Sequence, residues 1–165
     1  MKLIETTATI LHTELDKFDF ENPLIDPEEL SIQLVESMRK YEGIGLSANQ
    51  VGLPHRVFVM EGEPAYACFN PRIVLEGTEK VTLEEGCLSF IGLNVKIKRP
   101  KVIKVRFQGP DGEVYTKTLT GLSARVFQHE LDHLNGKVFY SRANTFHRDA
   151  AFKSWRAWKK KYNVA

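Results

Sequence analysis

Two amphipathic patterns predict helices on either side of a β-rich middle. Asp26-Pro27-Glu28-Glu29 offers an N-cap, a proline at the first helical position and a capping-box glutamate, and apolar residues then recur at helical spacing to about Tyr41. A second pattern follows Gly121 and stops at Asn135-Gly136, where glycine can take the left-handed conformation. Its apolar stripe comprises Leu122, Val126, Phe127, Leu131 and Leu134. We expect helices over about 27–41 and 122–134.

Between these helices the chain consists of short runs rich in β-branched and aromatic residues, separated by turn residues. The predicted strands are 57–60, 66–69, 72–75, 81–84, 93–98, 102–107 and 114–119. Gly109-Pro110-Asp111-Gly112 carries turn chemistry between the last two runs, which favours a hairpin. The order of elements predicts an α+β fold, with antiparallel sheets packed around the second helix.

Composition narrows the class of protein. The 165 residues, 42% of them hydrophobic, suit one core, and without a repeat or linker they predict a single domain over 1–165. A formal charge of +2 argues against a dedicated nucleic-acid binder. Two cysteines are too few for a disulfide framework, and no segment has the pattern of a signal peptide or the ~20 apolar residues of a membrane span. We expect a soluble cytoplasmic protein.

The second predicted helix contains a metal-binding pattern. His129-Glu130-Leu131-Asp132-His133 places two imidazoles at i and i+4, so both can face one ion from adjacent turns. A catalytic divalent site generally takes three protein ligands and leaves a position for water. The leading candidate for the third is Cys87, in Glu84-Glu85-Gly86-Cys87-Leu88-Ser89 just after a predicted strand. The alternatives are a solvated helix face for the histidines and a small buried apolar role for Cys87, as expected for Cys68.

A third segment, Gly43-Ile44-Gly45-Leu46-Ser47-Ala48-Asn49-Gln50, has small residues that let the backbone pass close to a site. Gln50 adds an uncharged hydrogen-bond donor. A phosphate-binding loop is the alternative, but the segment lacks the Lys-Ser/Thr ending of a P-loop and opens no obvious helix.

Together these segments resemble the peptide deformylase family, whose motifs are Gly-x-Gly-Leu-Ala-Ala-x-Gln, Glu-Gly-Cys-Leu-Ser and Gln-His-Glu-x-x-His. All three occur here in that order, and the resemblance extends over about 26–140. Phe69-Asn70-Pro71, Arg99-Pro100 and Ala124-Arg125 are similar to further family landmarks. The resemblance implies a hydrolase that removes the N-formyl group from the initiator methionine of nascent chains, releasing formate.

The resemblance also implies roles for individual residues. The metal ligands would be Cys87, His129 and His133. Glu130 would be the acid and base, with Gln50 and the Leu88 amide as oxyanion donors. Fe²⁺ is the usual native metal of the family, and Zn²⁺ or Ni²⁺ are possible occupants. Spacing alone does not select among them, because a thiolate and two imidazoles accept all three.

For the substrate, the resemblance implies that Gly45 contacts the peptide backbone. An apolar methionine pocket would map to Ile44, Leu122 and Val126. Two positions depart from the family pattern: Ser47 stands where alanine is usual, so its hydroxyl needs a partner, and Asn94 lies near where some members carry an arginine that grips substrate.

The C-terminal segment predicts a basic helix over about 144–162. We favour a solvated helix face, although bacterial family members use a basic C-terminal helix to contact the ribosome. A monomer in a bacterial or phage-infected cytosol is expected, with an organelle left open as the setting. His12, His55 and His147 receive no role. The competing functions are a metallopeptidase, which would have a different third ligand, and a noncatalytic zinc module, which would need a fourth.

Overall fold

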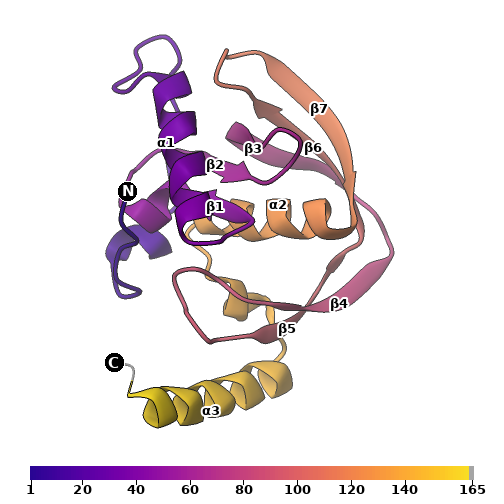
Figure 1. Ribbon diagram of the computed structural model, residues 1–165. Helices are drawn as coiled ribbons and strands as arrows, with labels where there is room; N and C mark the ends of the chain where they lie inside the picture. The colour runs from indigo at the N-terminus through magenta and orange to yellow at the C-terminus, as the bar shows by residue number, and fades with distance from the viewer. Residues whose placement is uncertain (164–165) are drawn as a thin grey trace.

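The computed structural model of the chain describes residues 1–163; Val164 and Ala165, the last two residues of the predicted catalytic domain, lie outside the described residues. Its helices are α1 (Pro27–Lys40), α2 (Gly121–Leu134) and α3 (Thr145–Tyr162), with 3-10 turns η1 (Thr9–His12), η2 (Ala48–Val51) and η3 (Phe139–Arg142) (Figure 1). The Asp26 side chain caps α1 by accepting a 2.8 Å hydrogen bond from the Glu29 amide. After α2, Gly136 has φ +65, the conformation expected of a glycine stop.

The strands form two antiparallel sheets. A five-stranded sheet has the order β1-β2-β3-β6-β7, and β4 and β5 form a separate hairpin. The strands are β1 (Gly45–Ser47), β2 (Val57–Met60), β3 (Tyr66–Glu76), β4 (Lys80–Glu85), β5 (Val95–Pro100), β6 (Val102–Gln108) and β7 (Val114–Thr120). These sheets lie on either side of α2 (Figure 1), which confirms the expected α+β architecture around a central helix.

Three details differ from the predicted elements. The runs at 66–69 and 72–75 are one strand, β3, because pairing with β6 continues past a register shift between Phe69 and Arg72. Asn70, at φ 49, and Pro71 occupy this irregularity, which is where a sheet tolerates proline. The run at 93–98 begins pairing only at Val95. The Gly43–Gln50 segment contains the short strand β1, which was not predicted. All residues of β1 are buried, so they lack the alternation that marks a strand in sequence.

The central helix is buried along most of its length. Residues 124–134 of α2 are all buried. One side packs on the five-stranded sheet, where the Phe127 and Phe58 rings meet edge to face at 5.0 Å. The β4–β5 hairpin lies beyond its other side, and α3 packs against the far face of that hairpin (Figure 1). The polar residues of α2 are therefore buried as well, and each needs a partner.

No helix within residues 1–163 combines the length and the apolar character needed to cross a membrane.

Candidate active site

Three potential ligand atoms meet between α2 and the end of β4. One atom each from Cys87, His129 and His133 lies within 4.8 Å of the other two, and Cys87 Sγ is 3.2 Å from His133 Nε2. Bond lengths of a tetrahedral zinc-type site, ~2.3 Å to sulfur and ~2.0 Å to nitrogen, require ligand atoms about 3.5 Å apart. The cluster therefore fits a single divalent ion with a thiolate and two imidazoles.

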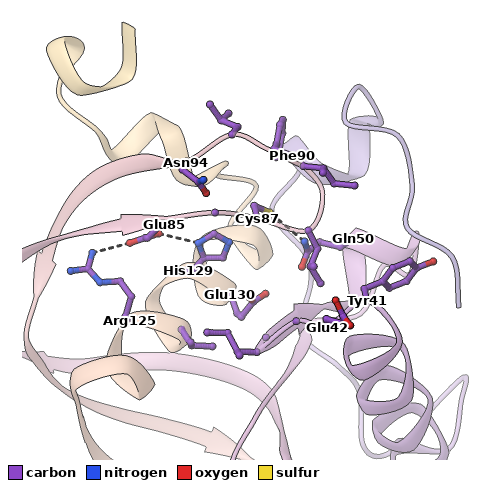
Figure 2. A pocket seen from close by; sticks show the side chains of 18 of the residues that line it. Tyr41, Glu42, Gln50, Glu85, Cys87, Phe90, Asn94, Arg125, His129 and Glu130 are labelled. Atoms are coloured by element: carbon purple, nitrogen blue, oxygen red, sulfur yellow. Dashed lines mark hydrogen bonds and ion pairs between the residues drawn. The ribbon is translucent and has the colours of Figure 1, made fainter. Parts of the chain in front are cut away.

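The orientation of His129 is set by Glu85, the last residue of β4. Glu85 Oε2 lies 3.0 Å from His129 Nδ1, which leaves Nε2 for the cluster (Figure 2). Arg99 Nε and Arg125 Nη1 donate to Glu85 Oε1 at 2.7 and 2.8 Å. Carboxylates in this position fix the ring and tautomer of a metal-binding histidine.

Electrostatics favour the charged forms of these groups. Burial opposes ionisation of Glu85, but hydrogen bonds from His129 and Arg99 outweigh it and lower the pKa of its carboxyl to about 2. Burial likewise raises the pKa of the Cys87 thiol, yet His133 and His129 bring it well below its usual range. The two histidines thus favour the thiolate, the form that binds a metal ion.

His133 is held through its backbone. Asn49 Nδ2 donates to the His133 carbonyl at 2.7 Å, which ties η2 to α2 directly at the cluster. His133 Nδ1 is buried without a hydrogen-bond partner in the part of the chain that the structure describes, whereas its Nε2 faces Cys87.

The ion pairs around Glu85 continue to the other side of α2. Arg99 Nη1 donates to Asp132 at 2.7 Å, and Asp132 also binds Arg142. From the sequence, Arg99 and Arg125 were predicted only as family landmarks, and no role was predicted for Glu85 or Asp132. The sequence did contain an indication of a role for Glu85 and Asp132, because each is an acidic residue within two positions of a candidate metal ligand.

Glu130 is the second carboxylate of the site. Its side chain is buried, and burial raises its pKa although both histidines act in the opposite direction. Ser47 Oγ donates to Glu130 Oε2 at 2.7 Å, which answers the question of where this hydroxyl finds a partner. A Cβ on Gly45 would lie 2.5 Å from Glu130 Oε1, so the carboxylate packs directly on the glycine backbone. β1 therefore positions Glu130 from two sides.

Gln50 faces the cluster from η2. Its Oε1 accepts a 2.9 Å hydrogen bond from the Ser47 amide, so the NH₂ group is turned toward the cluster. Nε2 lies 3.0 Å from Ser89 Oγ and 3.5 Å from Cys87 Sγ (Figure 2).

These groups line an open cleft of about 640 Å³, here called the metal cleft. Nine of the ten predicted site residues line it, and the tenth, His133, is buried and is not among the lining residues. They are Ile44, Gly45, Gln50, Cys87, Leu88, Leu122, Val126, His129 and Glu130. The cleft is also lined by residues that no motif marked as functional, namely Tyr41, Glu42, Phe90 and Ile91. They directly adjoin two of the motifs in sequence, before Gly43 and after Ser89.

A Cys-His-His cluster beside a buried acid, at the base of an open cleft, defines the class: a metal-dependent hydrolase. The family model for polypeptide deformylase matches residues 1–149, and the chain belongs to that family. It is therefore a hydrolase that removes the formyl group from nascent peptides.

Individual relatives agree in sequence and in fold. Peptide deformylase of Thermotoga petrophila is 48% identical over 111 residues, covering 67% of this chain and 68% of the relative. That of Aquifex aeolicus is 37% identical over 89% of each chain. The crystal structure of the Thermus thermophilus enzyme is similar with a TM-score of 0.85 at 33% identity, covering 94% of this chain and 92% of that one.

Proposed function

We propose that this chain deformylates N-formyl-methionyl peptides with an ion held by Cys87, His129 and His133, and with Glu130 as acid and base. The main support is the position of Glu130: it lies at the cleft, adjacent in sequence to one ligand, and Ser47 holds its carboxylate at 2.7 Å. A structural metal site has no use for a buried acid placed in this way.

Glu130 carries the proton through the reaction. When bound, the ion supplies Lewis acidity, which makes water more acidic and the formyl carbonyl more electrophilic. Glu130 takes a proton from the attacking water as the water oxygen bonds to the formyl carbon. It then gives that proton to the amine nitrogen as the C–N bond breaks, releasing formate and a free N-terminus.

Charge on the formyl oxygen is stabilised by donors that are oriented in advance. Gln50 is the first, because its Oε1 is held by the Ser47 amide and its NH₂ group points to the cluster. The backbone amide of Leu88, next to Cys87, is the second. A donor of this kind commonly contributes about 3 kcal/mol to the transition state.

The methionine side chain would occupy the apolar part of the cleft. Val126 is buried there, whereas Ile44 and Leu122 are 49% and 62% exposed, so a bound side chain would cover surface that is now accessible. Gly45 lies in β1, an edge strand of the five-stranded sheet, whose unpaired side would contact the peptide main chain.

The test is formate release from formyl-Met-Ala-Ser by protein purified anaerobically with Fe²⁺, compared with Glu130→Gln at equal metal content. We expect an active parent and a variant slower by about a thousandfold or more, within the range of lost acid-base catalysis. Full activity in the metal-loaded variant would refute the mechanism. Peptide-bond cleavage without formate would instead indicate a metallopeptidase.

Fe²⁺ is the proposed native ion, with Zn²⁺ and Ni²⁺ accepted because thiolate and imidazole ligands suit all three. Elemental analysis of anaerobically purified protein tests this, and loss of activity in air should accompany oxidation of the thiolate. We further propose a monomer that works in the cytoplasm as one catalytic unit.

Ribosome contact through α3 remains a prediction. Lys153, Arg156, Lys160 and Lys161 are exposed on this helix, which fits either a solvated face or a phosphate-rich partner. Cosedimentation with ribosomes, measured for Lys160→Glu/Lys161→Glu and for a deletion of 153–165, distinguishes a solvated face from a ribosome contact. Binding that neither change weakens would rule out α3 as the anchor.

A further inference from the structure

A second hollow, of about 510 Å³, lies between α3 and the β4–β5 hairpin. Three aromatic residues of α3 line it, namely Phe146, Trp155 and Trp158. We call it the aromatic hollow. None of its α3 residues takes part in the chemistry described above.

Two of these aromatics are fixed in place, and the third is not. Trp155 Nε1 donates to the Ile91 carbonyl at 2.9 Å, and the Trp158 ring packs so closely on Gly92 that a Cβ there would lie 2.8 Å away. Phe146, by contrast, is 78% exposed. A large exposed aromatic side chain beside two ordered tryptophans is apolar surface of the kind that marks a binding site.

The aromatic hollow adjoins the metal cleft. Glu84, Gly92 and Asn94 line both hollows, and all three are exposed. These three residues therefore form the boundary that the two hollows share, and the Trp158 ring packs on Gly92 from the side of the aromatic hollow. In Figure 2 Asn94 stands beside the strand that leads to Cys87, on the side of the metal cleft away from Tyr41.

The chemistry of the aromatic hollow favours an apolar ligand without charge. Glu84 and Lys96, an acidic and a basic residue of its lining, are directly opposite each other in the β4–β5 register. Their charges offset one another at the rim. The three aromatic residues and two alanines, Ala150 and Ala151, supply the apolar part of the lining, which suits an apolar or aromatic side chain. Asn94, His147 and Ser154 supply its other polar groups.

We propose that the aromatic hollow is a downstream subsite of the metal cleft and receives an apolar side chain several residues after the formyl-methionine of the same nascent peptide. The inference rests on the proposed function, since it takes a formylated peptide as the ligand of the metal cleft. The boundary that the two hollows share at Glu84, Gly92 and Asn94 is the reason for choosing this occupant over a separate partner. Each residue of an extended peptide adds about 3.3 Å, so seven residues span more than 20 Å.

The experiment compares formyl-Met-Ala-Ser with peptides extended by two to six residues, each ending in Leu-Phe or Gly-Ser. The readout is the ratio of kcat/KM for the apolar extension to that for the short peptide. We expect a ratio of about five at the length that reaches the hollow, consistent with partial burial of one aromatic side chain. The Gly-Ser series should stay near one.

Phe146→Ala should bring the ratio close to one, because it removes aromatic surface that the apolar side chain would contact. The Phe146 side chain is exposed, so its truncation should not disturb the fold. Trp158→Ala is the second variant and should lower the ratio in the same way. Tyr115→Ala is the matched control, an exposed aromatic residue of β7 that does not line the hollow. The control should keep the ratio at about five.

Other outcomes would overturn the inference. Equal ratios in the parent and in Phe146→Ala, or no gain with length in the parent, would exclude the subsite. A change of oligomeric state in Phe146→Ala, with an unchanged ratio, would identify a second copy of the chain as the occupant. Failure of the proposed function is distinguishable, because then the short peptide itself would release no formate.

Discussion

Replacing Glu85 by glutamine tests how far the metal cluster depends on the ion-pair network behind it. Glu85→Gln keeps the shape of the side chain and removes its charge. His129 could still donate to the amide oxygen, but Arg125 would lose its carboxylate partner and keep only the carbonyls of Ile97 and Val81. Arg99 would retain Asp132. The variant therefore leaves one buried guanidinium poorly compensated and weakens the anchor of one ligand.

Two estimates of the stability loss agree. Removing one partner of a buried ion pair generally costs about 3–5 kcal/mol. Lowering the pKa of the Glu85 carboxyl from 4.5 to about 2 corresponds to about 3 kcal/mol in the free energy of unfolding, at 1.36 kcal/mol per pKa unit. Because the folded pKa is the lower one, this contribution is complete above about pH 4.5 and is lost as the pH falls toward 2. Loss of a partner behind a metal ligand typically weakens metal binding about 10–100-fold.

Urea unfolding of the metal-free protein at pH 7 measures the first effect, and competition with a chelator measures the second. Glu79→Gln is the matched control, since Glu79 pairs with Lys101 at 2.9 Å on the surface and its side chain is 69% exposed. That change should cost less than about 1 kcal/mol and leave metal affinity unaltered. If Glu85→Gln behaved like the control in both assays, the argued coupling between network and cluster would be wrong.

Three further predictions concern the site itself. Ser47→Ala should lower kcat about three- to tenfold at unchanged metal content, because it removes the hydrogen bond to Glu130. Ser31→Ala, which changes another buried serine, should leave kcat unchanged. Equal kcat values for Ser47→Ala and the parent would argue against a positioning role for Ser47. Gly45→Ala should lower kcat by about a hundredfold, because its Cβ would lie 2.5 Å from Glu130 Oε1 and displace the carboxylate, whereas near-normal turnover would mean that the loop yields. A chelator should abolish formate release and lower the Tm by several degrees, both reversed by adding Fe²⁺ or Zn²⁺; activity that survives verified metal removal would contradict the metal requirement.

Local patterns sufficed for much of the fold. The N-cap at Asp26, the stop at Asn135-Gly136 and the alternating runs of the middle segment act over a few residues, so they predicted α1, α2 and most strands. β1 was not predicted, because a fully buried strand has no alternation of apolar and polar residues. β3 was predicted as two strands, because its residues 70–71 resemble a turn when they are considered in isolation. Both depend on pairing with strands that are distant in sequence.

By itself the sequence determined which residues could carry the chemistry. The i, i+4 spacing of His129 and His133 follows from the helix alone, and the three motifs in order pointed to Cys87, Glu130 and Gln50. Only the tertiary structure decided how these residues are held: Glu85 behind His129, and Ser47 against Glu130. Such contacts join residues more than 40 positions apart, and the burial of residues 124–134 of α2 is what makes each of them necessary.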